Sequence, residues 1–207
     1  MLRWERGQNV LHARKETAAI LIVCTGNVCR SPLMERLLVS RLDERLGAPQ
    51  RRRHIEVASA GTRALSGLPT TAEAAGELLR CGGDPDGFVA RQVMADMVND
   101  ADLVITATRA HRAEVVTLSP RATRYTFTAL ELARLLRDLE PSALSGDAAT
   151  RALSLAPAAA SRRGFIPPVP RGADDLPDPY GRPSADYRRV TDQMVPVVET
   201  LLSAIIG

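Results

Sequence analysis

The stretch ILIVCTGNVCRSPLMERLL, residues 20–38, changes from one structural pattern to another within a few positions. Its first part belongs to an apolar, β-branched run at 18–23, which is typical of a strand buried on both faces. Its second part begins with Pro32, which suits the first turn of a helix, and carries leucines at helical spacing up to Gly47. Residues 24–31 are therefore predicted to form a loop that leads from a buried strand directly into a helix.

Strand and helix patterns keep alternating along the rest of the chain. Further strands are predicted at 54–62, 102–108 and 124–128, and further helices at 69–83, 109–120, 129–140 and 183–206. This order predicts one α/β domain at 19–207, a doubly wound, mostly parallel four-stranded sheet with helices on both faces. Pro196 is expected to kink or divide the last helix. Two segments lie outside the pattern: a charged, loosely ordered extension at 1–18 and an Ala-, Pro-, Ser- and Gly-rich insertion at 141–173, expected to be mobile.

The composition is that of a globular protein without a strong preference for polyanions. In 207 residues, 27 basic side chains face 24 acidic ones, and no basic stripe with interleaved aromatics indicates a nucleic-acid partner. No apolar run is long enough to span a membrane, and the first residues lack the apolar core of a secretory signal. Three cysteines do not form an even disulfide framework. We therefore expect a cytoplasmic protein that binds neither nucleic acid nor membranes.

The loop at 24–31 has the residues of an anion site with a nucleophile beside it. A loop between a strand and a helix directs backbone N–H groups at a bound anion, and the helix N-terminus adds positive charge. Arg30 offers a planar fork for two phosphate oxygens. The same field favours the thiolate of Cys24, to which Ser31 can donate a hydrogen bond. The loop therefore predicts a thiolate aimed at the phosphorus of a bound phosphate. Left-handed dihedrals are expected at Gly26 and Asn27.

The motif CTGNVCRSP, residues 24–32, resembles the active-site loop of the low-molecular-weight protein tyrosine phosphatases. The similarity continues through VASAGT (57–62), ARQV (90–93) and ADLVITATRAHR (101–112). The resemblance implies hydrolysis of phosphotyrosine in protein substrates through a phosphocysteine intermediate, with no metal or cofactor. Inorganic phosphate is then both product and inhibitor.

The resemblance also implies a general acid from an Asp-Pro pair near the C-terminus, which here is Asp178 followed by Pro179. A proton donor is needed because a phenolate leaves poorly. The alternative for Asp178 is an ordinary Asp-Pro turn, and Asp174 and Asp175 are rival carboxylates. The predicted catalytic residues are Cys24, Arg30 and Asp178. The predicted substrate-binding residues are Thr25, Gly26, Asn27, Val28, Cys29, Ser31 and Tyr180.

Other activities on the same scaffold remain as alternatives. Arsenate reductases use two further downstream cysteines, whereas only Cys81 is present here. Protein-arginine phosphatases typically carry threonine at the position of Val28. The apolar Val28 therefore favours a tyrosine phosphatase over an arginine phosphatase here. A catalytically idle phosphate-binding regulatory module is the alternative of another class.

Three features depart from the family pattern or stay open. Phe88 stands where many members have a histidine that supports the loop, so another group must brace Asn27. Cys29 is either a partner for a protective disulfide with Cys24, as in the family, or a small packing residue. The insertion at 141–173 directly precedes Asp178, and is expected either to gate it or to act as a spacer.

Overall fold

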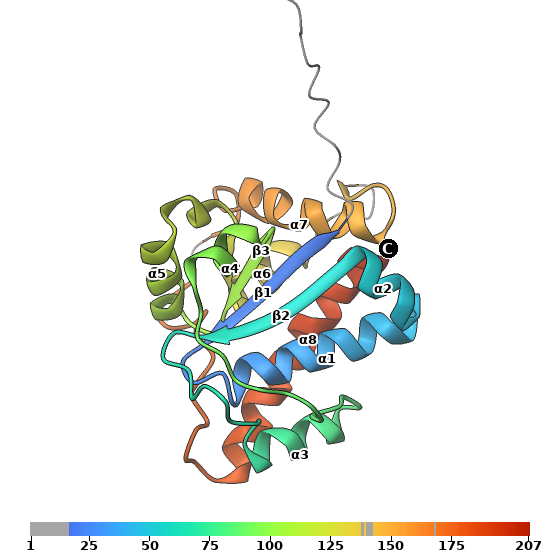
Figure 1. Cartoon of the computed structure of the whole chain (residues 1–207). Coiled ribbons are helices and arrows are strands. Elements are labelled where there is room, and N and C mark those ends of the chain that lie inside the picture. The colour runs from blue at the N-terminus through green and yellow to red at the C-terminus, as the bar shows by residue number, and fades with distance from the viewer. Residues whose placement is uncertain (1–16, 138, 140–142, 168) are drawn as a thin grey trace, which may run out of the picture.

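The computed structural model describes residues 17–137, 139, 143–167 and 169–207. Its centre is a four-stranded sheet in the order β2-β1-β3-β4, in which every pairing is parallel (Figure 1). The strands are β1 Ala18–Cys24, β2 Ile55–Gly61, β3 Leu103–Thr106 and β4 Thr126–Thr128. The predicted α/β fold with a parallel sheet is confirmed. β1 lies in the middle of the sheet, so the loop that follows it starts between the carboxyl ends of two neighbours.

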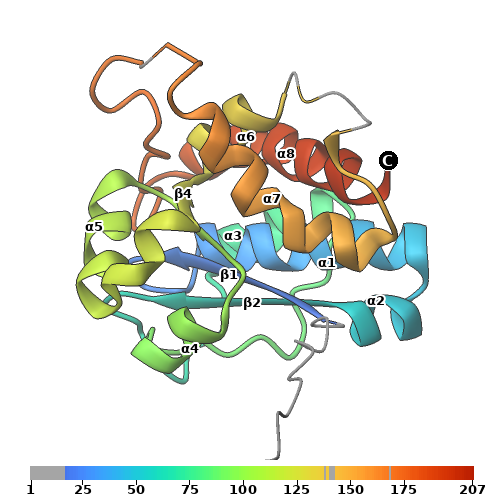
Figure 2. The ribbon, with the colours of Figure 1, turned by 90° about the horizontal axis from the view of Figure 1, so that it is seen from above.

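Helices cover both faces of this sheet. Figure 2 shows α4 on one side of the strands and α1, α7 and α8 on the other. The helices are α1 Arg30–Leu46, α2 Ala48–His54, α3 Ala72–Arg80, α4 Ala95–Asp100, α5 Arg109–Leu118, α6 Ala129–Leu136, α7 Ala148–Arg162 and α8 Ser184–Ile206, with a 3-10 helix at Pro120–Arg124. Two layers of helix around one sheet are what the alternating sequence pattern predicts.

The central strand β1 is buried on both faces, as its apolar run predicts. Ile20 and Ile22 belong to the larger core, together with α1, α6, α7 and α8. Leu21 and Val23 belong to a second core on the opposite face, formed with residues from α4, α5 and the 3-10 helix. Successive side chains of a strand point to opposite faces, so an uninterrupted apolar run supplies both cores at once.

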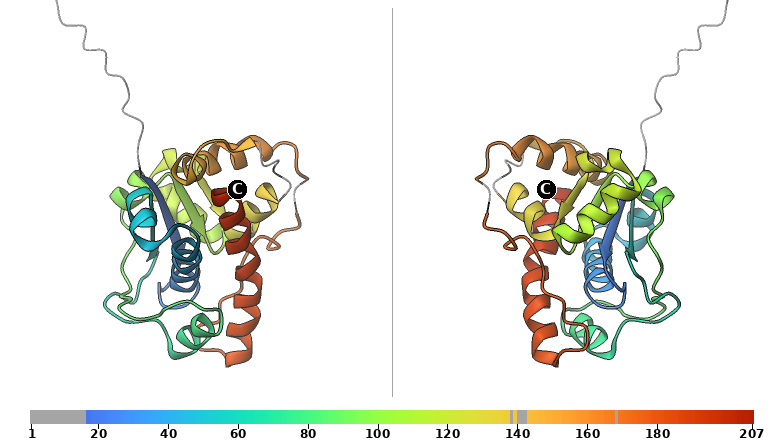
Figure 3. Two further views of the ribbon diagram at one scale, coloured as in Figure 1. Left: turned by 90° about the vertical axis from the view of Figure 1, so that its right-hand side faces the viewer. Right: turned by 90° about the vertical axis from the view of Figure 1, so that its left-hand side faces the viewer.

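The insertion at 141–173 contains a helix, which the sequence did not predict. Residues 148–162 form α7, and the expectation of a segment without regular structure is wrong there. Asp147 accepts a hydrogen bond from the N–H of Thr150 and so caps the helix. One face of α7 is buried in the larger core through mostly small side chains, namely Ala152, Leu155, Ala156 and Ala159. Figure 3 shows α7 packed beside the C-terminal part of α8.

Substitution of Leu155 tests whether α7 is part of the folded core. The Leu155 side chain is fully buried, so Leu155→Ala removes buried apolar surface and leaves a cavity. The free energy of unfolding should fall by about 3 kcal/mol, measured by urea denaturation. Ser161→Ala, an exposed change on the same helix, should alter it by less than about 0.5 kcal/mol. Equal stability of the two variants would show that α7 is not part of the cooperative core.

Two terminal expectations are refined by the structure. Residues 1–16 of the predicted extension lie outside the described residues, and Ala18 already opens β1. α8 continues through Pro196 as one helix, so of the two alternatives, a kink or a division into two pieces, the division is wrong and the kink stays a prediction. None of the helices in the described part of the chain is long and apolar enough to cross a membrane.

Candidate active site

The loop after β1 is held in place by hydrogen bonds to its carbonyl groups. The carbonyl oxygens of Cys24, Thr25, Gly26 and Val28 accept bonds from the N–H groups of Thr62, Arg63, Leu65 and Thr71, at 2.9–3.0 Å. Residues 25–29 donate no backbone N–H to any other residue that the structure describes. The loop therefore keeps several N–H groups for an anion, as expected for a strand-to-helix loop.

Backbone conformation differs between the two residues expected to be left-handed. Asn27 has a φ of 55° and is the only non-glycine residue with positive φ in the described part of the chain. Gly26 is not left-handed, so that expectation is wrong. Gly61, at the end of β2, is the glycine that the loop requires. A Cβ on Gly61 would lie 2.4 Å from the carbonyl oxygen of Thr25, too close for any other residue.

A buried polar network lies behind the nucleophile candidate. The Cys24 Sγ is 3.0 Å from the Ser31 Oγ, and both side chains are buried. Asn27 Nδ2 donates to Ser31 Oγ at 2.8 Å. Because Ser31 Oγ accepts from the amide, its own proton is available for Cys24 Sγ. The Ala60 carbonyl is a second acceptor for that proton, but at 3.5 Å it is the longer contact.

Asn27 is braced without the histidine that Phe88 replaces. Its Oδ1 accepts from the Arg91 N–H at 2.9 Å, and its Nδ2 also donates to Ser59 Oγ at 2.8 Å. Ser59 in turn donates to the Glu35 carboxylate, whose pKa is raised by burial. The sequence analysis did not identify Ser59 or Glu35. Ser59 supports Asn27 from β2, and Glu35 of α1 contacts Ser59, so neither role follows from the residues next to it in the sequence.

Arg30 joins the loop to the segment that carries Asp178. Its guanidinium is 4% exposed and donates from Nη1 to the Leu176 carbonyl at 3.1 Å. Nη2 lies 2.7 Å from Asp178 Oδ2 and donates to Thr25 Oγ1 at 3.3 Å. Asp178 is half-exposed, at 49%. The ion pair therefore holds the Asp178 carboxylate beside the guanidinium that is the candidate phosphate-binding group.

The predicted site residues mostly meet in one pocket of about 140 Å³. Its walls include eight of the predicted residues, namely Cys24, Thr25, Gly26, Val28, Cys29, Arg30, Asp178 and Tyr180. Asn27 and Ser31 do not line the pocket but lie behind the loop, where they support it. Arg63 and Leu65 complete the walls, and no local sequence pattern distinguishes either one.

The rival carboxylates have other partners. Asp174 is buried and lies 3.1 Å from both Arg109 and Arg134. Asp175 accepts a 2.7 Å hydrogen bond from the Arg109 N–H. Neither residue lines the pocket, so Asp178 is the carboxylate placed there.

Cys29 is buried in a small cluster with Phe88 and Tyr187. Its Sγ is 3.6 Å from Tyr187 Oη and 3.7 Å from Thr71 Oγ1, and burial raises the pKa of the thiol. All three cysteines of the chain are free thiols here. The Cys24–Cys29 disulfide thus stays a prediction. In the described part of the chain, no cluster of His, Cys, Asp or Glu side chains is suited to hold a metal ion.

A buried histidine, His111, completes the site from α5. Its Nε2 is 2.8 Å from Thr25 Oγ1 and its Nδ1 is 2.9 Å from Thr108 Oγ1. The Arg30 guanidinium has only donors, so Thr25 Oγ1 accepts from it and can donate its own hydroxyl proton to His111 Nε2. Nε2 is then the acceptor nitrogen, and the ring proton lies on Nδ1. Burial, and then the charge of Arg30, lower the pKa of His111 to about 4. The ring is therefore neutral at pH 7.

This histidine should make stability depend on pH. Its pKa in the folded chain, about 4, is lower than the ordinary 6.5, so the unfolded chain binds more protons between these values. Its stabilising contribution is complete above about pH 6.5 and is lost as the pH falls toward 4, by about 3 kcal/mol in total. In urea denaturation from pH 4 to 7, His111→Gln should lack this part of the pH dependence. Identical pH slopes for the two proteins would contradict a neutral His111.

The described geometry matches a known family. The model of the "Low molecular weight phosphotyrosine protein phosphatase" family matches residues 19–134. The low molecular weight protein-tyrosine-phosphatase Etp of Escherichia coli (strain K12) is 36% identical over 102 residues, which are 49% of this chain and 62% of that protein. The probable low molecular weight protein-tyrosine-phosphatase AmsI of Erwinia amylovora is also 36% identical, over 49% of this chain and 64% of its own length. The matched part thus spans less than two thirds of these relatives.

Solved structures extend the likeness of fold over most of the chain. The tyrosine phosphatase amsI of Erwinia amylovora has a TM-score of 0.62 at 23% identity, covering 91% of this chain and 93% of that one. The YwlE arginine phosphatase from Geobacillus stearothermophilus has a TM-score of 0.61 at 25% identity, covering 89% and 90%. From its matched motifs and its fold, this chain belongs to the low molecular weight phosphotyrosine protein phosphatase family.

Proposed function

We propose that this protein is a cysteine-dependent protein tyrosine phosphatase that hydrolyses phosphotyrosine through a phosphocysteine intermediate. One observation supports this most strongly: Cys24 and Arg30, from the two ends of one loop, line the same small pocket as Asp178, which lies far from them in the sequence. A nucleophile, a phosphate-binding fork and a proton donor are the three groups that this reaction needs. The experiment is an aryl phosphate assay with EDTA present, in which the wild-type protein should turn over and release inorganic phosphate.

The first half of the proposed reaction transfers the phosphoryl group to the enzyme. Arg30 and the free N–H groups of residues 25–29 hold the phosphoryl oxygens and offset their charge. The Cys24 thiolate attacks phosphorus, and the bond between phosphorus and the phenolic oxygen breaks as the sulfur–phosphorus bond forms. Asp178 gives its proton to the departing oxygen, so tyrosine leaves as a neutral phenol.

The second half releases phosphate. Asp178, now a carboxylate, takes a proton from a water molecule whose oxygen attacks phosphorus. The sulfur–phosphorus bond breaks, and inorganic phosphate and the Cys24 thiolate are formed. Ser31 donates to the returning thiolate from behind the loop. Phosphate then occupies the same loop as substrate does, and should inhibit competitively.

The walls of the pocket support an aromatic substrate. Val28 and Leu65 give apolar sides, and Tyr180 places a 57% exposed ring at the edge. Rings of substrate and protein attract each other through stacking as well as burial. Cys81, the only cysteine outside the loop, does not line the pocket, which disfavours an arsenate reductase relay.

The second candidate is a protein-arginine phosphatase, since one structurally similar protein is named as such. Val28 argues against it because two methyl groups cannot accept a hydrogen bond from a guanidinium. Val28→Thr adds a hydroxyl there and should raise the ratio of kcat/KM for a phosphoarginine peptide over a phosphotyrosine peptide by about tenfold or more. Val28→Ala, which removes methyl groups without adding a donor or acceptor, is the control. A wild-type preference for phosphoarginine would overturn the assignment.

We also propose a cytoplasmic location, where phosphorylated protein substrates and reducing conditions coincide. The three free thiols, one of them the proposed nucleophile, support this.

A further inference from the structure

A second cavity, of about 490 Å³, lies beside the segment that leads to Asp178. It is larger than the pocket at Cys24, which has about 140 Å³. α5, α6 and the stretch after α7 form its walls, so the insertion is part of it. We call it the arginine pocket; its charged lining residues are Arg109, Arg112, Arg134, Arg163, Glu131 and Asp174.

The charges in the arginine pocket do not balance. Asp174 is shared by Arg109 and Arg134, at 3.1 Å from each. Glu131 lies 2.9 Å from Arg163 and also accepts from the Thr128 N–H, so it is fully engaged as well. Four guanidinium groups against two carboxylates leave a net charge of two positive units around one cavity.

Two arginines lack sufficient partners. Arg112 donates from Nε to the Thr126 carbonyl at 3.1 Å and forms no ion pair with any described residue. Burial, and then the neighbouring Arg163, lower the pKa of Arg112, and the Glu131 carboxylate opposes this shift only in part. The Nε of Arg134 is buried and has no hydrogen-bond partner among the described residues. Four other buried side-chain atoms in the described part of the chain also lack a partner, so the charge of Arg112 without an ion pair is what distinguishes this pocket.

We propose that the arginine pocket binds a phosphate-bearing anion with at least two negative charges, at a site separate from the Cys24 loop. Guanidinium forks match the geometry of phosphate oxygens and bind them in pairs. The anion would supply acceptors for the partly buried Arg112 guanidinium and would neutralise the excess charge. The volume admits a group larger than one phosphate, and Leu135 and Ile166 provide apolar contacts for its remainder.

An anion bound in the arginine pocket should affect the active site by shifting residues 174–178. Asp174 anchors one end of that segment in the arginine pocket. Further along, the Leu176 N–H donates to the Ala107 carbonyl at 2.9 Å, and the Leu176 carbonyl accepts from Arg30. An anion that competes for Arg109 and Arg134 would leave Asp174 buried without its partners, which is costly, and the segment would shift. This coupling rests on the proposed function, because its consequence is the displacement of Asp178.

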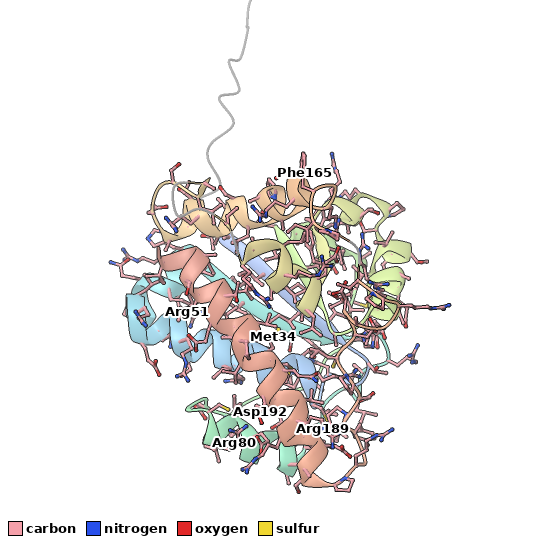
Figure 4. The ribbon with its side chains drawn as sticks, turned by 180° about the vertical axis from the view of Figure 1, so that it is seen from behind. Met34, Arg51, Arg80, Phe165, Arg189 and Asp192 are labelled. Atoms are coloured by element: carbon pink, nitrogen blue, oxygen red, sulfur yellow. The ribbon has the colours of Figure 1, made fainter. Side chains whose placement is uncertain are left out.

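Binding is tested with pyrophosphate at constant ionic strength, by isothermal titration calorimetry on the full chain. The wild-type protein should bind two pyrophosphates, one in each pocket. Arg30→Met should lose binding at the Cys24 loop and retain binding in the arginine pocket. Arg112→Gln should retain binding at the Cys24 loop and weaken the affinity of the arginine pocket by about tenfold or more. Arg189→Gln removes an equal charge from α8, at the opposite end of the molecule from Phe165 of the insertion (Figure 4), and should keep both sites.

Two results would overturn the proposal. One is a single site in the wild-type protein that disappears in Arg30→Met. The other is an equal loss of affinity in Arg112→Gln and Arg189→Gln, which would show only a general effect of charge. If Arg112→Gln does not fold, Arg112→Lys decides: it keeps the charge but lacks the fork, and an unchanged affinity would contradict the proposed contacts.

The coupling is tested by steady-state kinetics with an aryl phosphate. Pyrophosphate in the Cys24 loop raises KM, whereas pyrophosphate in the arginine pocket should lower kcat. Wild-type protein should show both effects and Arg112→Gln only the first. An unchanged kcat in the wild-type protein would refute the coupling while leaving the binding site intact, and a failure of the proposed function would leave the calorimetric test unaffected.

Discussion

Cys24→Ser should abolish the hydrolysis of aryl phosphates, with kcat reduced by at least about a thousandfold. A serine hydroxyl is not ionised at neutral pH, and the proposed first step needs Asp178 in its protonated form, so Asp178 is not available as a base for the serine. The nearest imidazole, that of His111, is turned toward Thr25 and Thr108. The variant should still bind phosphate, because Arg30 and the loop N–H groups are unchanged. Steady-state turnover and phosphate titration together separate loss of the nucleophile from loss of the fold.

The other cysteines provide matched controls for this change. Cys81→Ser alters a thiol outside the pocket and should leave kcat within about twofold of wild type. Cys29→Ser alters a thiol in the same loop, so a moderate effect on packing is expected, but turnover should remain. Activity of Cys24→Ser within tenfold of wild type would contradict the thiolate mechanism.

Asp178→Ala should lower kcat for phenyl phosphate by about a hundredfold to ten-thousandfold. Phenolate is a poor leaving group, so the loss of a proton donor raises the barrier directly. Nitrophenyl phosphate releases a more stable anion, which needs less protonation, so its first step should slow much less. The dependence of the loss on the leaving group distinguishes an acid from a residue that only shapes the pocket. Stopped-flow measurement of phenol release with both substrates gives this comparison.

An exposed aspartate on α8 serves as the control. Asp192, which pairs with Arg80 away from the site (Figure 4), can be changed to Asn with kcat expected within about twofold of wild type. Equal losses with phenyl and nitrophenyl phosphate in Asp178→Ala would argue against the role as acid. Asp174 and Asp175 would then have to be reconsidered, although the structure engages both with Arg109.

The parts that sequence predicted well are those determined by neighbours along the chain. The apolar run of β1, the loop and Pro32 at the start of α1 follow one another without interruption, so local patterns suffice to place Cys24 and Arg30. Where a strand ends next to a helix N-terminus, the backbone N–H groups of the connecting loop form the expected anion site.

The parts that sequence missed depend on contacts between distant segments. His111 meets Thr25 only because β3 lies beside β1 in the sheet. Ser59 braces Asn27 from the neighbouring strand β2. No local pattern distinguishes either residue from an ordinary polar side chain.

Helix α7 was missed for another reason. Its buried face consists mostly of alanine, and Pro157 lies inside it, so the contrast between apolar and polar positions is weak. The arginine pocket was equally hidden, because each of its arginines alone is unremarkable in a chain whose basic residues are nearly all arginine.

Cys24 should carry the phosphoryl group during turnover, and mass spectrometry of the intact protein tests this directly. Asp178→Ala should be mixed with nitrophenyl phosphate, quenched within milliseconds to seconds, and analysed by mass spectrometry with peptide mapping. Because Asp178 is also the proposed base that activates the water of the second step, this variant should accumulate the intermediate. We expect one added phosphoryl group, located on Cys24. Product release without any phosphorylated protein, or a phosphoryl group on another residue, would contradict it.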